Sequence, residues 1–260
     1  MARRRLPELG IQPLPARSLA LSALLGTHPP QLPVRALVAL GTLFGVAEGT
    51  MRTALSRMLD AGELTGADGV YRLGERMLQR QASQDSGRRP PPGAWDGSWW
   101  FAIVDAAPRP IGERRAFRTR MRHLRMGELR PDVWLRPANI DGPDPSGGVL
   151  VVRGPIEGRD PRDLARRLWD LDQLAATSRT LGTVIEDALT WIEADGDDAL
   201  VDTFLVSVAT VRFLLAEPRL PGALVGPRWP PDELRARYDR LEVAHRARMA
   251  SFLTAASIRP

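Results

Sequence analysis

Cysteine and lysine are both missing from the 260 residues of the chain. Without cysteine the chain has no disulfide, no thiol nucleophile, no cysteine-ligated zinc and no iron–sulfur cluster. Without lysine, a Walker A phosphate loop, Schiff-base chemistry and a lysine general base are excluded. The sequence also has no Gly-x-Ser-x-Gly, Gly-x-Gly-x-x-Gly or His-Glu-x-x-His motif. We therefore expect a protein that is not an enzyme and that needs no cofactor.

Long apolar runs are missing as well. No stretch of about 18 apolar residues predicts a membrane span, and the basic start Met1–Arg5 is not followed by the apolar core of a signal peptide. We expect a cytoplasmic protein. The net charge is +5, and every strongly basic side chain is an arginine. This positive charge permits binding to a polyanion but does not establish it.

The segment from Ala47 to Leu59 carries the clearest pattern. Its apolar residues recur at helical spacing and form one stripe that would be buried. The opposite face carries short hydroxyls and arginines, which contact phosphates and base edges well when a helix lies in the major groove. The residues that we expect to contact DNA on this helix are Thr50, Arg52, Thr53, Ser56 and Arg57.

Two helices are expected before this segment, over Arg17–Thr27 and Pro33–Phe44, and a hairpin after it. The residues Ala67-Asp68-Gly69 separate two short apolar runs, which is a strong hairpin signal. The second run contains Arg72, a further candidate for DNA contact. Residues 1–80 therefore predict a winged helix-turn-helix, and the composition of residues 81–94 is typical of a linker.

Residues 95–175 predict a different domain. Strands are expected at Trp99–Val104, Val133–Leu135 and Val149–Arg153, with helices over Ile111–Met126 and Pro161–Ala175. This order matches a ferredoxin-like, split βαβ fold whose last strand is uncertain. Residues 176–260 have a helical pattern, so the fold class is α+β with a C-terminal helical domain for an effector or for dimerisation.

The chain resembles the phenylacetic-acid-degradation repressors, the PaaX-type regulators. The resemblance covers roughly residues 16–254, and the segments that carry it are Met51–Leu59, Trp95–Trp99, Gly127–Pro137, Arg212–Phe213, Glu217–Pro221 and Trp229–Pro230. It implies a homodimeric repressor that binds an inverted-repeat operator in double-stranded DNA. It also implies release from DNA by an aryl-CoA or a related acyl-CoA thioester.

The middle domain offers candidates for the effector. Arg114, Arg118 and Arg122 share one side of the expected helix and could hold phosphates of a CoA thioester, although a solvated face explains them equally simply. Trp134 could line an aromatic pocket. Two other classes stay open. One is a metal-dependent nuclease centred on Asp105, and the other is a winged-helix module that binds protein.

Overall fold

The computed structural model of the chain describes residues 14–88, 94–105, 110–145, 148–194 and 196–258. The chain divides into two compact units. Unit 1 consists of Met1–Arg88, Leu181–Val211 and Ala236–Pro260, and unit 2 consists of Arg89–Thr180 and Arg212–Arg235. The C-terminal residues, expected as one helical domain from residue 176, are thus divided between the two units.

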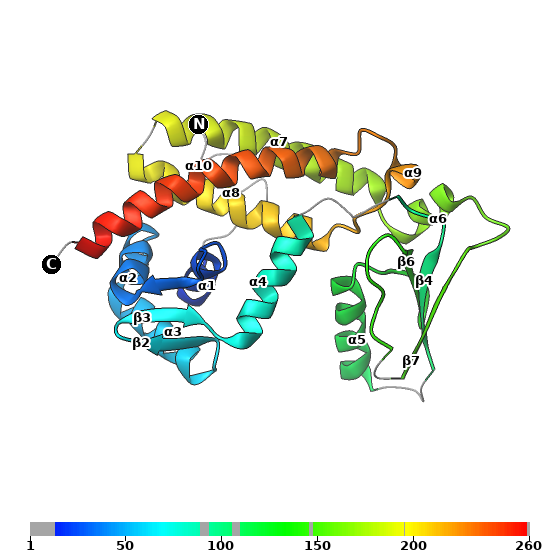
Figure 1. The fold of residues 1–260 in the computed structure, drawn as a ribbon, viewed down its shortest axis with the longest axis horizontal. Coiled ribbons are helices and arrows are strands. Elements are labelled where there is room, and N and C mark those ends of the chain that lie inside the picture. The colour runs from blue at the N-terminus through cyan, green and yellow to red at the C-terminus, as the bar shows by residue number, and fades with distance from the viewer. Residues whose placement is uncertain (1–13, 89–93, 106–109, 146–147, 195, 259–260) are drawn as a thin grey trace. The chain divides into compact units, whose positions relative to one another are not determined.

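Unit 1 begins with a winged-helix-like arrangement (Figure 1). Its elements are α1 (Ala16–Leu25), β1 (Gln31–Pro33), α2 (Val34–Leu43), α3 (Glu48–Asp60), β2 (Leu64–Ala67), β3 (Val70–Leu73) and α4 (Glu75–Arg88). The three strands form one antiparallel sheet in the order β1-β3-β2. The helix and hairpin expected from the sequence are confirmed, whereas β1 was not foreseen.

Three glycine-dependent turns shape this region. Gly45, with φ of +74°, lets the chain reverse between α2 and α3. Asp68 and Gly69 have φ of 52° and 72° at the tip of the hairpin, as the primed two-residue turn requires. At the base of the hairpin, Gly62 also has a positive φ, 65°. α3 is therefore followed at once by a tight β-wing.

Helix α4 continues through Gln81 to Arg88, into the segment whose composition indicated a linker. The amide of Gln81 donates to the backbone oxygens of Leu25 at 2.8 Å and Thr27 at 3.2 Å. These contacts anchor α4 to α1. The remaining residues of the expected linker, 89–93, lie outside the described part of the chain.

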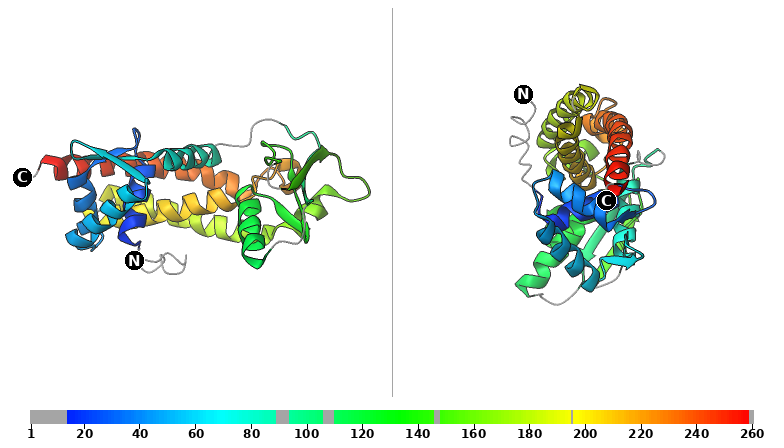
Figure 2. Two further views of the ribbon diagram at one scale, coloured as in Figure 1. Left: turned by 90° about the horizontal axis from the view of Figure 1, so that it is seen from below. Right: turned by 90° about the vertical axis from the view of Figure 1, so that its left-hand side faces the viewer.

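Three long helices follow: α7 (Leu171–Ala194), α8 (Gly196–Ala216) and α10 (Pro230–Ile258). They run side by side in Figures 1 and 2. Phe204 of α8 belongs to the core of unit 1 and meets Phe44 edge-on, with ring centroids 5.2 Å apart. Met249 and Phe252 of α10 pack against the same core. The winged-helix-like region, α8 and α10 therefore share one core.

Helix α8 contains an 18-residue window, Ala199–Ala216, that is apolar and long enough to cross a membrane by length and composition. Its side chains are used inside unit 1, because Leu200 and Val206 are fully buried and Thr203 bonds to His245 of α10. A core helix accounts for this pattern.

Unit 2 is built on a four-stranded antiparallel sheet in the order β5-β6-β4-β7. Its elements are β4 (Trp99–Val104), α5 (Ile111–His123), β5 (Gly127–Arg130), β6 (Val133–Pro137), β7 (Val149–Gly154), α6 (Pro161–Leu168) and α9 (Gly222–Val225). The strand β5 was not expected, and it makes Val149–Gly154 the fourth strand instead of the third.

Alternate residues of the sheet face two different cores. Ala102 and Trp134 pack with Phe117 and Met121 of α5. Figure 1 shows this helix beside the sheet. Trp99 lies three positions before Ala102 on β4, and Leu135 lies next to Trp134 on β6, so both face the other way and pack with α6 and α9.

This corrects the ferredoxin-like expectation in part. The strand order agrees with a split βαβ unit, but the second helix of that fold should lie between the third and fourth strands. Here α6 follows the fourth strand and covers the opposite face from α5. The helix expected over 161–175 is also interrupted, since Trp169 is extended with φ of −138° and ψ of 145°.

Candidate nucleic-acid interface

The two faces of α3 differ sharply. Met51, Leu55 and Met58 are at most 1% exposed and belong to the core of unit 1. The predicted DNA-contacting residues of this helix are all exposed: Thr50, Arg52, Thr53, Ser56 and Arg57. The structure thus brings the whole predicted set onto one accessible helix face, held from behind by packed side chains.

Two of these side chains already have partners on α3. Arg52 donates from Nε to Oε1 of Glu48 at 2.7 Å, and both side chains are more than half exposed. Thr53 donates from its hydroxyl to the backbone oxygen of Gly49 at 2.8 Å. The hydrogen bond to Glu48 engages Nε of Arg52, so the two terminal nitrogens of this exposed side chain can still donate to phosphate or to a base.

The wing places Arg72 on β3, exposed, where its Nε donates to Oε1 of Gln31 at 2.9 Å. Gln31 lies directly opposite Arg72 in the β1–β3 pair. The short strand β1 therefore helps to orient Arg72, the arginine of the wing. No local sequence signal predicted this role for Gln31.

A buried carboxylate fixes the wing to the helices. Glu63, 4% exposed, accepts from both Nε (2.8 Å) and Nη2 of Arg17, and from Nη2 of Arg76 at 3.3 Å. The hydrogen bonds from Arg17 hold the pKa of Glu63 below its usual value. This contact ties α1, α4 and the start of the wing together.

A groove of about 600 Å³ runs beside the start of α3. Arginines from three helices line it, Arg35 of α2, Arg52 of α3 and Arg248 of α10, over a floor that includes Leu43 and Phe252. Sequence reasoning did not single out Arg35 or Arg248, because their proximity to Arg52 depends on tertiary packing.

The predicted effector residues of unit 2 do not gather in one place. Arg114, Arg118 and Arg122 are exposed on α5, and Arg118 pairs with Glu128 of β5 through Nε at 3.1 Å and Nη2 at 2.5 Å. Trp134 is 2% exposed beneath the helix, edge-on to Phe117 with centroids 6.4 Å apart. Trp134 is thus a core residue of the sheet in the described structure.

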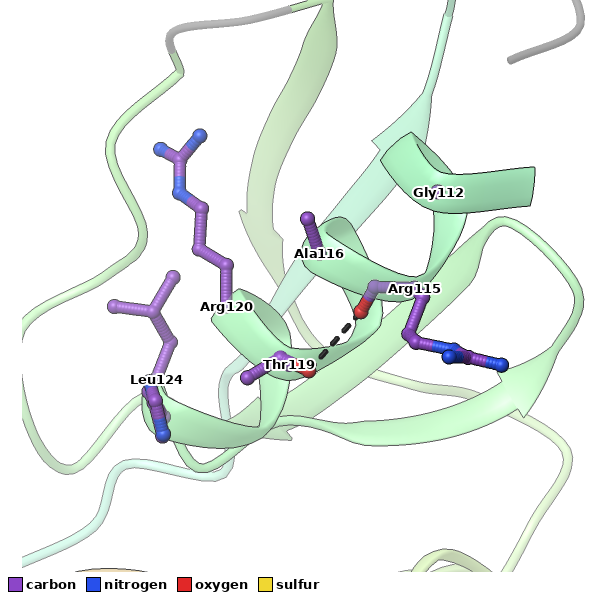
Figure 3. Close-up of a pocket in the computed structure, with 7 residues that line it drawn as sticks. Gly112, Arg115, Ala116, Thr119, Arg120 and Leu124 are labelled. Atoms are coloured by element: carbon purple, nitrogen blue, oxygen red, sulfur yellow. Dashed lines mark hydrogen bonds between the residues drawn. The ribbon is translucent and has the colours of Figure 1, made fainter. Parts of the chain in front are cut away.

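A shallow hollow lies on another side of α5, lined by Gly112, Arg115, Ala116, Thr119, Arg120, His123 and Leu124. Figure 3 shows the side chains of Arg115 and Arg120 pointing in different directions, and the hydroxyl of Thr119 donating to the backbone oxygen of Arg115 at 3.0 Å. The two charges do not converge, so this hollow offers no focused anion site.

Comparison with known proteins identifies the chain. The family description PaaX-like protein matches residues 15–77, and PaaX-like protein C-terminal domain matches residues 169–255. The chain belongs to the PaaX-like protein family. None of the curated proteins matches it. Among solved structures it is similar to the uncharacterized protein Rv0674 from Mycobacterium tuberculosis, with 38% identity over 94% of this chain and 99% of that one, and a TM-score of 0.70.

The match confirms the resemblance seen in the sequence and gives the class, since PaaX-like proteins are transcriptional regulators rather than enzymes. The first matched segment contains α3 and the whole wing. The sheet of unit 2, with the α5 arginines, lies between the two matched segments.

The nuclease alternative gains no three-ligand metal site among the described residues. Asp105 is exposed at the end of β4. Among the described residues, no three histidine or acidic side chains lie close enough together to hold a metal ion. Residues 106–109, directly after Asp105, are outside that description.

Proposed function

We propose that this PaaX-like protein is a cytoplasmic, DNA-binding transcriptional repressor. The exposed face of α3 carries the proposal. It presents two arginines and three hydroxyls on a helix whose other face is fully buried. A helix of this kind fits the major groove, where forked guanidiniums read guanine and hydroxyls contact phosphate.

The wing supports the same orientation. Arg72 lies on β3, the strand that follows the hairpin tip, and its Nε donates to Gln31. In winged helices the wing generally lies along the DNA backbone, beside the major groove that the recognition helix enters. A phosphate contact there adds affinity without adding sequence preference. In this proposal α3 reads the sequence and Arg72 adds electrostatic attachment.

The repressor is proposed to act as a homodimer on an inverted repeat. Two copies of α3 would enter successive major grooves on one side of the duplex, so half-sites should lie about 10 bp apart or a multiple of that. The regulator is not proposed to bind a membrane.

Release from DNA is proposed to follow binding of an aryl-CoA or a related acyl-CoA thioester. The support is family membership together with the exposed arginines Arg114, Arg118 and Arg122. Such an effector can weaken DNA binding only if it binds more tightly to a dimer geometry that does not fit the operator. The coupling free energy between the two sites is typically about 1–3 kcal/mol.

Fluorescence anisotropy of the full chain on its own upstream DNA, at several salt concentrations, tests the first part. Arg52→Ala and Arg57→Ala should each cost about 1–3 kcal/mol where the arginine contacts a base. Arg167→Ala, which removes an exposed arginine from α6, is the matched control and should leave the affinity unchanged. Equal affinity of the wild-type chain for upstream and random DNA would overturn the regulator proposal.

A further inference from the structure

The groove beside the start of α3 is formed by parts of unit 1 that are distant in sequence. Its lining residues come from α2, from the first turns of α3 and from the last turns of α10. Figure 1 shows the C-terminal end of α10 next to α2. The groove has a volume of about 600 Å³, which lies within the range of sites that hold small molecules, roughly 300–1,000 Å³.

Half of the lining is apolar. Leu43 and Phe252 are partly buried and pack against the core of unit 1, and Val38 belongs to that core. The packed core therefore holds this side of the groove in place. The remaining apolar residues of the lining are short: Ala39, Ala255 and Ala256. An apolar surface of this kind favours contact with the apolar body of a ligand.

The charged residues of the lining are three arginines and one glutamate: Arg35, Arg52, Arg248 and Glu48. Glu48 accepts from Nε of Arg52 at 2.7 Å, so the acid of the lining is already engaged. Arg35 and Arg248 are exposed, and within the described part of the chain no acidic side chain forms an ion pair with either. The groove thus offers two guanidiniums whose charge is not compensated by the described residues.

The other polar side chains of the lining are two hydroxyls that bond to their own helices. Thr42 donates to the backbone oxygen of Val38 at 3.3 Å, and Ser251 donates to the backbone oxygen of Ala247 at 3.1 Å. Because both hydroxyl hydrogens are engaged, the arginines are the donors that remain for a ligand. A guanidinium donates two parallel hydrogen bonds to a carboxylate or a phosphate.

We infer that this groove binds a small amphipathic anion, a molecule with an apolar body and one carboxylate or phosphate group. The apolar body would lie on Leu43 and Phe252, and the acidic group would bind Arg35 and Arg248. A bare anion, or an uncharged apolar molecule, would use only one half of the lining. A phosphate of the DNA backbone would likewise leave the apolar half uncovered, so the lining favours the amphipathic ligand over DNA.

The ligand would compete directly with DNA. Arg52 lines the groove and also belongs to the face of α3 that is proposed to meet DNA. An anion bound beside Arg52 places negative charge where the phosphates would approach, so each partner weakens binding of the other by the same factor. This competition rests on the proposed function, whereas the ligand site does not. It requires no change in dimer geometry.

Calorimetric titration of the full chain in the absence of DNA tests the site. Octanoate, octyl phosphate and uncharged octanamide are titrated separately, below the concentrations at which micelles form, with sodium chloride holding the ionic strength constant. We expect saturable binding of octanoate or octyl phosphate, and binding of octanamide that is at least tenfold weaker. The tighter of the two anions identifies the acidic group that the arginines prefer.

Two variants locate the binding in the groove. Arg35→Gln combined with Arg248→Gln removes both uncompensated guanidiniums and should weaken anion binding at least tenfold. Ala255→Leu fills part of the groove from α10 without a change of charge, and it should have an effect of similar size. Thermal unfolding of each variant confirms that the chain remains folded.

Each variant has a matched control that should bind the anion as wild type does. Ala250→Leu lies at an exposed position of α10 outside the lining, and Arg159→Gln combined with Arg167→Gln removes two exposed arginines of unit 2. The ligand site is overturned if wild type binds neither anion saturably, if octanamide binds as tightly as the anions, or if both groove variants bind as wild type does.

Fluorescence anisotropy on the upstream DNA tests the competition separately. A saturating concentration of the anion should raise the Kd of wild type for DNA several-fold and leave that of Ala255→Leu unchanged. Saturable anion binding with no effect on DNA binding would keep the site and overturn the competition. No anion binding, together with weaker DNA binding when Arg35 and Arg248 are replaced, would assign these arginines to DNA phosphates instead. Failure of wild type to select its upstream DNA would remove the proposed function and leave the calorimetric result standing.

Discussion

The carboxylate of Glu48 and the guanidinium of Arg52 are joined by a 2.7 Å hydrogen bond across one turn of α3, on the face proposed to meet DNA. Exposed pairs at this spacing stabilise a helix by about 0.3–0.5 kcal/mol. The pair also places a negative charge beside Arg52, one of the two arginines of α3 proposed to contact DNA. Glu48 therefore competes with DNA for Arg52.

Glu48→Gln should consequently tighten DNA binding. The substitution removes the charge that would face the phosphates and frees Nε of Arg52, at a small cost in helix stability. We expect a several-fold lower Kd at low salt, measured by anisotropy, with a smaller gain at high salt. Asp163→Asn breaks an exposed pair with Arg166 on α6, in the other unit, and serves as the control. Weaker binding by Glu48→Gln would mean that Glu48 itself accepts from a base.

The wing base should not tolerate a side chain at position 74. Gly74 donates its N–H to the backbone oxygen of Glu63 at 2.8 Å, and a Cβ there would overlap the backbone oxygen of Gly62. Gly74→Ala should lower the free energy of unfolding by about 1–3 kcal/mol, because backbone must shift to make room.

The matched control is Gly49→Ala, where a Cβ would meet nothing within 4 Å. Because alanine favours the helix, its stability should stay level or rise by up to about 1 kcal/mol. Thermal unfolding of both variants checks the comparison. An unchanged melting temperature for Gly74→Ala would show that the backbone at the base of the wing can shift at little cost in free energy, against this prediction.

Acid should destabilise unit 1 through His245. The ring is 9% exposed, its Nδ1 lies 2.9 Å from the hydroxyl oxygen of Thr203, and burial lowers its pKa from 6.5 to about 4. Between these two values the unfolded chain binds a proton that the folded chain does not. His245 therefore costs no stability above about pH 6.5, and up to about 3 kcal/mol is lost as the pH falls through 6.5 to 4.

The check is the pH dependence of the melting temperature in His245→Gln and in His123→Gln, whose histidine is exposed. Between pH 6.5 and 4 the first variant should lose less stability than wild type, and the second should lose as much. Parallel curves for wild type and His245→Gln would contradict the assignment.

The parts that the sequence predicted are those whose signal is local. The apolar spacing around Met51 and Leu55 and the Asp68-Gly69 turn specify α3 and its hairpin within one short stretch. β1 was not predicted, because it is three residues long and pairs with β3 about forty positions further along the chain. Local sequence therefore predicts the helix proposed to read DNA, whereas the pairing of Gln31 with Arg72 depends on tertiary structure.

Unit 2 was harder to predict for a related reason. Gly127–Arg130 is too short to stand out after a helix, and once it is a strand the order of the remaining elements changes. Spacing also did not show which arginines of unit 2 are buried. Arg125 shares the spacing of the exposed α5 arginines, yet the chain turns at that residue, with φ of +61°, and buries it against Glu217.

Substitutions on α5 test the effector proposal. Arg114→Ala combined with Arg122→Ala removes two exposed arginines, and each lost contact to an effector phosphate should cost about 0.5–1 kcal/mol. The thioester concentration that releases DNA should then rise several-fold, while DNA affinity without thioester stays the same. Arg115→Ala combined with Arg167→Ala is the control of equal charge.

Anisotropy with a titrated aryl-CoA measures this release. Unchanged release in the variant with both Arg114→Ala and Arg122→Ala would remove the α5 arginines from the effector site.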